Sequence, residues 1–465
     1  MGSEDSPKIN ITPPEEKVGF SLTKEFLELA FDREVEKFST KIGTNPGDNY
    51  LSIMHAVEVS FKGEQEPQYF MIKCYPNHSE RRDLLDQIEV FSKEAFAYQD
   101  FLPQLKQLAV EREAEKIVDL SVAPIQAGNV VGIPSKFTLK PWSDENFILM
   151  TDIRKTFGFT MADRMKGLDF DHAKLVLEEI AKFHALTWAY KQKNGLDMLT
   201  NKYPQFKDTF YIHESLIQDY MPLLDQITAN ALKLTEEKLG DSHPACKSFK
   251  DFVSKDEDKD VVERIKRYLL EEGINEEEVE SYLRIKPEQD DNYNREPWLL
   301  GTHGDCWVNN MMFLYNDEEP KKPVKVTLVD WQVIREACPT VDLAYFLFSS
   351  VRAPVRIPNL DELLRVYHDA FIRYCDALKV APLPGFTIET LKRRFRRSEI
   401  FGLLIGLELL GYALKPPEES IDMDTVKSDQ LMDLFATVVD GSDKNTLLQD
   451  EISATVLNLY EKGVI

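Results

Sequence analysis

Three oxygen-bearing side chains, Asp305, Asn310 and Asp330, stand at the ends of apolar segments in the second half of the chain. The segments read as short buried β-strands, and they cover residues 298–300, 311–314 and 325–329. The last two would form a hairpin, so the three side chains should converge at one end of it. Asp and Asn are also common in ordinary turns. Three of them beside buried strands nevertheless predict one shared site better than three unrelated turns.

The loop that carries the first two of these residues has the spacing His-x-Asp-x-x-x-x-Asn, which is typical of phosphoryl-transfer enzymes. His303 and Asp305 begin the pattern, Asn310 ends it, and Gly304 stands where an Arg is common. In such a loop the Asp accepts the proton of a substrate hydroxyl, whereas the Asn and a later Asp hold Mg²⁺ on ATP. The spacing therefore predicts His303 and Asp305 as catalytic residues, and Asn310 and Asp330 as Mg²⁺ ligands.

Enzymes of this kind also need a Lys on an earlier strand and a Glu on the following helix. Residues 50–61 and 68–73 read as a hairpin that ends at Lys73. A helix over about residues 83–102 would place Glu94 at the edge of its buried stripe. In isolation both would be read as surface charges. Desolvating an unpaired carboxylate is costly, so Lys73 is the expected partner of Glu94, and both are predicted to serve ATP binding.

Five segments of the chain together resemble the ecdysteroid kinase-like family, in the choline kinase and aminoglycoside phosphotransferase branch of the protein kinase-like fold. They are residues 48–52, 90–98, 182–185, 303–310 and 329–332. The resemblance runs from about Ser21 to at least Leu414. Gly304, and Gln332 two residues after Asp330, fit this branch better than the His-Arg-Asp and Asp-Phe-Gly of protein kinases. Cys306 and Trp331 are mild departures from the family pattern.

The resemblance implies an α+β, bilobal protein kinase-like fold, with a small β-rich N-terminal lobe and a larger, mainly helical C-terminal lobe. We expect a mobile leader over residues 1–20, the N-terminal lobe over residues 21–150 and the C-terminal lobe over residues 151–465. A helix over residues 23–38 is predicted at the start of the small lobe, with inward-facing side chains at Phe26, Leu29, Ala30 and Phe38.

The resemblance also implies the remaining binding residues. Gly47, Asn49 and Ser52 would cover the phosphates, although residues 43–49 taken alone could equally be a hairpin turn. Met150 and Asp152, at the end of an apolar strand, would form the hinge that receives the adenine. Asp342 would brace the catalytic loop through its backbone, and His184 is expected to be a hydrogen-bonded core histidine.

Composition limits the partners and the compartment. The net charge of −24 argues against nucleic-acid binding, which needs a basic surface. Five scattered cysteines give neither a zinc site nor a disulfide framework, and together with the absence of a signal peptide they favour the cytoplasm. The longest apolar run, residues 400–414, is too short to span a bilayer and reads as a buried helix. We expect a monomer.

The sequence thus predicts a kinase that uses Mg-ATP to phosphorylate a small-molecule alcohol, and the resemblance implies an ecdysteroid-like or other hydrophobic alcohol. Aromatic residues between Tyr203 and Tyr220 could line the acceptor pocket or belong to the core. A choline, ethanolamine or aminoglycoside kinase is the alternative within this class. A protein kinase is disfavoured because the Asp-Phe-Gly and Ala-Pro-Glu landmarks are missing. A pseudokinase that only binds ligands is disfavoured because all five predicted charged and metal-holding residues are present.

Overall fold

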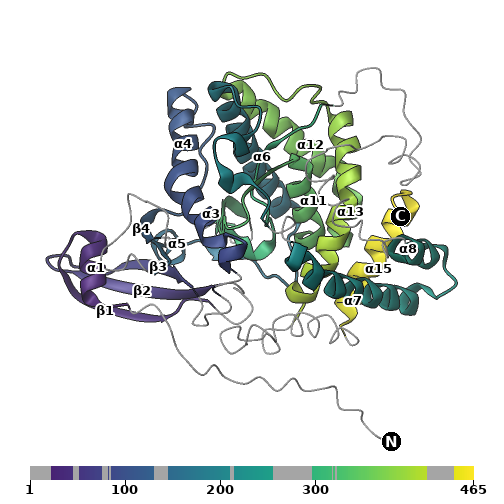
Figure 1. Ribbon diagram of the computed structural model, residues 1–465, viewed down its shortest axis with the longest axis horizontal. Coiled ribbons are helices and arrows are strands. Elements are labelled where there is room, and N and C mark those ends of the chain that lie inside the picture. Colours follow the sequence, from purple (N-terminus) through teal and green to yellow (C-terminus); the bar gives the residue numbers. More distant parts are fainter. Residues whose placement is uncertain are drawn as a thin grey trace, which may run out of the picture.

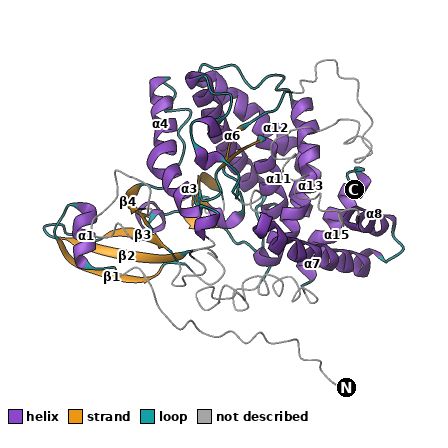
Figure 2. Cartoon of the chain, viewed as in Figure 1, coloured by secondary structure: helices purple, strands orange, loops and turns teal. Residues whose placement is uncertain are grey.

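The computed structural model of the 465-residue chain describes residues 22–44, 52–75, 82, 85–129, 145–209, 214–254, 296–316, 318–319, 322–415 and 445–465. The predicted leader and the predicted phosphate-covering residues Gly47 and Asn49 lie outside these ranges. Long strands gather at one end of the molecule, and helices make up most of the rest (Figures 1 and 2).

An antiparallel five-stranded sheet forms the N-terminal part, in the order β1-β2-β3-β5-β4. Its strands are β1 (Val35–Ile42), β2 (Ile53–Phe61), β3 (Gln68–Cys74), β4 (Ile125–Asn129) and β5 (Phe147–Thr151). Side chains alternate between the two faces of a strand. Phe70 and Ile72 therefore join the core under helix α1 (Lys24–Phe31), whereas Lys73 points to the opposite face.

The predicted helix over residues 23–38 is wrong in its second half. Helix α1 ends at Phe31, and Asp32 follows in the left-handed conformation with φ of 49°. The chain then enters β1, where Phe38 pairs with Val59 of β2. Leu29 was expected to face inward and is 44% exposed. Pairing with β2 stabilises residues 35–42 as a strand, and such tertiary contacts override a helical pattern in the local sequence.

The helix that carries Glu94 was predicted over about residues 83–102, but it begins at Val90, ends at Glu111 and is less regular than predicted. It consists of α3 (Val90–Phe96), a π-helical turn η1 (Ala97–Phe101) and α4 (Leu102–Glu111). Pro103, at the start of α4, has no N–H group to donate to the preceding turn. A wider π turn just before such a residue accommodates the missing hydrogen bond. Glu94 itself lies in the α-helical part.

From Asp152 onward the chain is mainly helical. Helix α6 (Phe170–Asn194) buries Ile180, Phe183 and Leu186 and packs along α12, while α11 packs against α13. The other helices are α5 (Ile153–Phe157), α7 (Glu214–Leu239), α8 (Pro244–Ser254), α11 (Pro339–Ser350), α12 (Ala353–Ala377), α13 (Ile388–Ala413) and α15 (Thr446–Glu461). Short 3₁₀ turns are η2 (Leu199–Asn201), η3 (Pro204–Phe206) and η5 (Val308–Asn310).

The predicted buried helix over residues 400–414 is the second half of α13, where most side chains are buried. In the part of the chain that the structure describes, no helix combines the length and the apolar character needed to cross a bilayer.

Two small sheets lie at the start of the helical part and carry the predicted loop. Strands β8 (Met311–Tyr315) and β9 (Pro323–Leu328) form the predicted hairpin, and β6 (Thr160–Met161) adds to its edge. Strand β7 (Leu300–Thr302), just before the loop, pairs with β10 (Arg335–Ala337) and not with the hairpin. The loop is thus anchored at its two ends in two different sheets.

The predicted fold class is confirmed: the structure is α+β, with a small sheet-containing N-terminal lobe and a larger helical C-terminal lobe. We propose that the boundary between the lobes lies at the end of β5, near residue 150.

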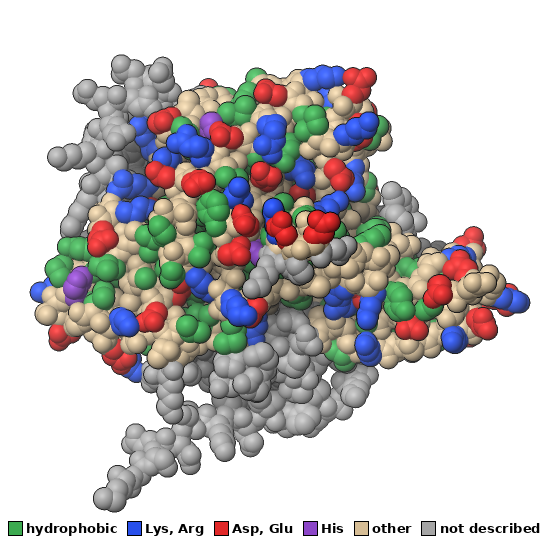
Figure 3. All heavy atoms as spheres, turned by 180° about the vertical axis from the view of Figure 1, so that it is seen from behind, with side chains coloured by type: hydrophobic (Ala, Val, Ile, Leu, Met, Phe, Trp, Pro, Cys, Tyr) green, Lys and Arg blue, Asp and Glu red, His purple; other side chains and the backbone are tan. Residues whose placement is uncertain are grey.

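On the face shown in Figure 3, Lys and Arg side chains are interspersed with Asp and Glu side chains.

Candidate active site

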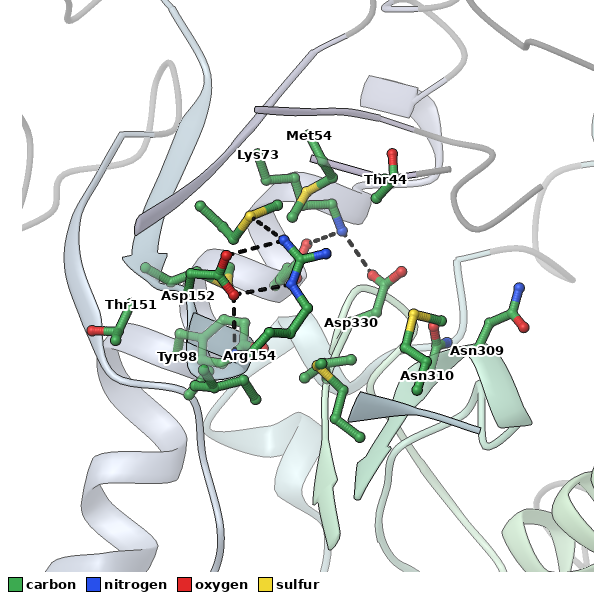
Figure 4. A pocket seen from close by; sticks show the side chains of 18 residues that line it. Thr44, Met54, Lys73, Tyr98, Thr151, Asp152, Arg154, Asn309, Asn310 and Asp330 are labelled. Atoms are coloured by element: carbon green, nitrogen blue, oxygen red, sulfur yellow. Dashed lines mark hydrogen bonds and ion pairs between the residues drawn. The ribbon is translucent and has the colours of Figure 1, made fainter. Parts of the chain in front are cut away.

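The structure brings together three segments that are far apart in the sequence. Lys73 Nζ at the end of β3 lies 2.6 Å from Glu94 Oε2 on α3 and 2.7 Å from Asp330 Oδ1 after β9. Gln332 Oε1 is 3.4 Å from the same nitrogen. The predicted ion pair between Lys73 and Glu94 is therefore present, and Asp330 joins it (Figure 4).

Burial and charge set the protonation of this cluster. Burial alone would lower the pKa of Lys73, but the carboxylates of Asp330 and Glu94 outweigh it and raise that pKa above its ordinary value. Burial also raises the pKa of Glu94 to about 7, because the attraction of Lys73 offsets only part of the desolvation. Lys73 is thus a permanent cation at neutral pH, in a place where phosphate oxygens could replace Asp330 as its partner.

Asp305 is held in one orientation by two hydrogen bonds. Tyr345 Oη donates to Asp305 Oδ1 at 2.5 Å, and Asn310 Nδ2 donates to Oδ2 at 2.8 Å. Burial, followed by the repulsion of Asp330, raises the pKa of Asp305 to about 7. A carboxylate with a pKa near the working pH is well suited to accept a proton from a substrate. The arrangement allows Asp305 to act as a general base.

Asp342, near the start of α11, fixes the backbone of the catalytic loop. Its carboxylate accepts hydrogen bonds from the N–H groups of His303 at 2.8 Å and Gly304 at 3.0 Å. This confirms the brace predicted for Asp342. His184 is a buried core histidine, as predicted, and its ring lies 3.2 Å from Asp342 and 2.8 Å from the Tyr367 hydroxyl.

Gly304 explains why this loop lacks the arginine found in protein kinases. Its φ is +82°, a conformation that costs a residue with a side chain more than it costs glycine. A Cβ atom at this position would lie 2.2 Å from the carbonyl oxygen of Val333. The backbone of the loop therefore approaches the segment after Asp330 too closely for any side chain.

Both ring nitrogens of His303 lie against backbone groups in the part of the chain that the structure describes. Nε2 lies 3.0 Å from the carbonyl oxygen of Val329, and Nδ1 accepts from the Asp305 N–H at 3.3 Å. Burial lowers the pKa of His303, so the ring is neutral, with its proton on Nε2. His303 was predicted as a catalytic residue; its position suits a residue that joins the catalytic loop to the strand before Asp330.

The two predicted Mg²⁺ ligands are joined through their backbones. Asn310 ends η5, Asp330 follows β9 with φ of 65°, and the Val329 N–H donates to the Asn310 carbonyl at 3.0 Å. With the residues that the structure describes, the Asn310 side chain makes two hydrogen bonds, and its nitrogen donates both of them to Asp305. Its oxygen Oδ1 and the Asp330 carboxylate are the hard oxygen ligands that Mg²⁺ prefers. The donor set fits a Mg²⁺ ion that is shared with phosphates.

A pocket opens beside these residues and differs in character at its two ends. It encloses about 120 Å³. Lys73, Glu94, Asn310 and Asp330 line one part, and the rest is largely apolar. Five methionines contribute to the apolar part, namely Met54, Met71, Met150, Met161 and Met312. Methionine side chains adapt to flat apolar groups.

Tyr98 also lines the pocket and supports its use as a binding site. Its hydroxyl is buried near the Asp330 backbone and makes no hydrogen bond of regular geometry with the residues that the structure describes. A buried polar atom without a partner is costly, and a bound ligand could supply one. The residues present thus fit a nucleotide that has an apolar base and a charged, metal-bound phosphate chain.

Other predicted binding residues lie at the edge of this pocket or outside the described chain. Met150 and Asp152 line the pocket at the hinge. Asp152 caps α5 by accepting from the Arg154 N–H at 3.0 Å. Ser52 is buried just before β2, where the predicted phosphate-covering loop ends.

Two side chains in this region had not been singled out from the sequence. Tyr345, which contacts Asp305, lies three residues after Asp342 and hence on the same face of α11. That helical spacing was a usable signal. Arg154, which enters the pocket from α5, had no such signal, because its contacts with Gly43 and Met71 depend on the tertiary fold.

The aromatic residues that were considered for an acceptor pocket are core residues where they can be described. Phe206 is fully buried against Phe101, and the Tyr203 hydroxyl lies 2.6 Å from that of Tyr190. Phe210, Tyr211 and Tyr220 lie outside the residues whose side chains the structure describes.

The match to a protein family agrees with the pattern of the site. A comparison with protein families matches residues 46–380 to the Ecdysteroid kinase-like family. A structural comparison finds an ethanolamine kinase of Plasmodium vivax, with 11% sequence identity, a TM-score of 0.38, and coverage of 89% of this chain and 83% of that one. A comparison with curated proteins found no match. The family match spans the Lys73, Glu94, Asp305 and Asp330 segments, and the chain belongs to the ecdysteroid kinase-like family.

Proposed function

We propose that this chain, a member of a small-molecule kinase family, transfers the γ-phosphoryl group of ATP to the hydroxyl group of an alcohol. The observation that carries the proposal is that Lys73 Nζ lies within 2.7 Å of a carboxylate oxygen of both Glu94 and Asp330. The carboxylate of Asp305, held in place by Tyr345, is close to this cluster. Enzymes that bind and transfer phosphoryl groups need this combination of a fixed cation, metal-holding oxygens and a base.

Lys73 would bind the phosphates of ATP, and Glu94 would hold the Lys73 ammonium in place. Met150 and Asp152 would border the base at the hinge, and Ser52 would lie near the phosphates together with Gly47 and Asn49 of the preceding loop. The apolar, methionine-rich part of the pocket supports placing the base there. The same residues would serve a nucleotide whatever the acceptor is.

Asn310 and Asp330 would hold Mg²⁺. When bound, the ion would neutralise phosphate charge that otherwise repels the incoming oxygen. Asp305 would accept the proton of the acceptor hydroxyl and orient its oxygen toward the phosphate. Tyr345 and Asn310 keep the Asp305 carboxylate from rotating, and His303 would hold the loop against the strand before Asp330.

The proposed acceptor is a hydrophobic alcohol of the ecdysteroid type. Membership of the family supports this choice. None of the five cysteines, all of which the structure describes, forms a disulfide bond, which supports a reducing compartment such as the cytoplasm.

The proposal is tested by incubating the protein with Mg-ATP and a mixed panel of steroid, choline-type and aminoglycoside alcohols. Mass spectrometry should detect a phosphorylated steroid alcohol as the main product. Phosphocholine or a phosphorylated aminoglycoside as the main product would contradict the acceptor class but keep the kinase. Phosphorylated serine or threonine in added protein, without a small-molecule product, would contradict the function itself.

A further inference from the structure

The side chain of Arg154 crosses the pocket from the hinge to the first strands. Its Nε and Nη2 donate to the two carboxylate oxygens of Asp152, at 2.9 and 3.1 Å. Its Nη1 donates to the carbonyl oxygen of Gly43 at 2.8 Å, and Nη2 lies 2.9 Å from Met71 Sδ. Figure 4 shows Arg154 among the side chains that line the pocket, with its guanidinium turned toward Asp152.

With Arg154 in this position the pocket is smaller than most small-molecule sites. Its volume is about 120 Å³, whereas pockets that bind small molecules usually enclose about 300–1,000 Å³. Met71 and Met150, which line the same space, are each more than 90% buried and fixed by the sheet. The side chain of Arg154 is 35% exposed and stands on a short helix. Arg154 is thus more accessible to solvent than these two methionines, and it leaves the pocket once its hydrogen bonds to Asp152 and Gly43 break.

Through its hydrogen bond to Gly43, Arg154 also contacts the hairpin of β1 and β2. Gly43 lies directly after β1, and its N–H donates to the Met54 carbonyl at 2.7 Å. A Cβ atom on Gly43 would lie 2.3 Å from the terminal methyl of Met71, so the backbone packs closely over that side chain. Arg154 thus joins the end of β1 to the start of α5, across the mouth of the pocket.

A second cavity also borders the side chain of Arg154. A groove of about 510 Å³ lies on the outer side, and Arg154, Asp152 and Thr44 line both it and the nucleotide pocket. Glu58, an exposed carboxylate, is part of the wall of this groove. The groove is therefore a second space beside the guanidinium, and it has carboxylates of both Asp152 and Glu58 in its lining.

We propose that Arg154, together with Asp152 and Gly43, forms a latch that closes the nucleotide pocket, and that nucleotide binds only when Arg154 turns into the outer groove. Arg154 is then a residue that sets nucleotide affinity. The inference rests on the proposed function, since it takes the pocket to be the nucleotide site. A latch that is closed most of the time reduces the apparent affinity in proportion to the open fraction.

The test is the Kd of Mg-ATP for the full-length protein, measured by isothermal titration calorimetry without any acceptor. Arg154→Ala removes the latch and should lower the Kd about tenfold, which corresponds to about 1.4 kcal/mol. Lys155→Ala is the matched control, because Lys155 is an exposed cation on the same helix that lines only the outer groove. Its Kd should stay within about twofold of the wild-type value. Circular dichroism checks the fold, and Arg154→Gln, which removes the charge, should also lower the Kd.

The possible outcomes distinguish a failure of the latch proposal from a failure of the proposed kinase function. If the wild-type protein binds Mg-ATP and neither Arg154 variant binds it more tightly, the latch is wrong and the proposed function stands. A higher Kd in both variants would mean that Arg154 contacts the nucleotide, which also overturns the latch. If neither the wild type nor the Arg154 variants bind Mg-ATP, both the latch and the proposed function are wrong.

Discussion

At the scale of single residues, the chemistry of the site depends on Asp305 and on how its carboxylate is held. Burial and Asp330 raise the pKa of Asp305 to about 7, while Tyr345 and Asn310 hydrogen-bond to its charged form and oppose that rise. Hydrogen bonds to the charged form of a carboxylic acid favour that form. The same two donors therefore orient the proposed base and limit the rise of its pKa.

This predicts a specific pH dependence. Asp305 can accept a proton only when it is ionised, so kcat/KM should fall as the pH drops below about 7. Tyr345→Phe removes one donor to the carboxylate and should move this acidic limb to higher pH. A pH–rate profile of both proteins checks the prediction. A flat profile between pH 5 and pH 8, or a limb that moves to lower pH in the variant, would exclude Asp305 as the titrating base.

A second prediction at this scale concerns the pair of Lys73 and Glu94. Lys73→Met should weaken nucleotide binding and turnover, and Glu94→Gln should do so by releasing the Lys73 ammonium. Because the two side chains are 2.6 Å apart, the effects should be non-additive, with a coupling of about 0.5–3 kcal/mol. The double-mutant cycle is measured on kcat/KM. Additive effects would mean that Glu94 does not act through Lys73.

At the scale of secondary-structure elements, hydrogen bonds of Lys93 join α3 to the helical lobe. Lys93 is the residue directly before Glu94. Lys93, 1% exposed, donates to the carbonyl oxygens of Lys207 at 2.6 Å and Ile334 at 3.1 Å. Burial lowers the pKa of Lys93 to about 8. A buried cation that satisfies two carbonyl groups fixes the helix and hence the position of Glu94.

We therefore expect Lys93→Met to loosen α3. The substitution keeps most of the volume but leaves two buried carbonyl groups without their donor, which costs about 1–3 kcal/mol for each unsatisfied group. Urea unfolding should show this loss, and hydrogen exchange should show faster exchange in residues 90–96. Lys106→Met, at an exposed position on α4, is the control and should change neither. Unchanged exchange in α3 would mean that Lys93 does not hold it.

The sequence was most informative where local pattern and chemistry coincide. Asp305, Asn310 and Asp330 were found because strand ends and motif spacing mark them, and the hairpin that carries two of them is present. The helix predicted over residues 23–38 failed because the pairing of β1 with β2 is not visible in the local sequence. Arg154 was missed for a similar reason, since its partner Gly43 lies 111 residues earlier.

At the scale of the whole molecule, both lobes contribute walls to one pocket, so a bound nucleotide should stabilise them together. Saturating Mg-ATP at 100 times its Kd would add about 2.7 kcal/mol to the free energy of unfolding. The expected result is a rise of several degrees in the Tm that depends on Mg²⁺. Asp330→Asn should remove most of the Mg²⁺ dependence and lower turnover at least about 100-fold. An equal Tm rise with and without Mg²⁺ in the wild type would contradict the assignment of Asn310 and Asp330.

The most direct test of the central claim is the fate of the γ-phosphate of ATP. With γ-³²P-labelled ATP, Mg²⁺ and the alcohol panel, the wild-type protein should place the label on oxygen of a small organic product. Asp305→Ala should bind Mg-ATP as tightly as the wild type but transfer label about 10²–10⁴-fold more slowly. Label that appears only in inorganic phosphate or in protein, or equal transfer by both proteins, would contradict the account.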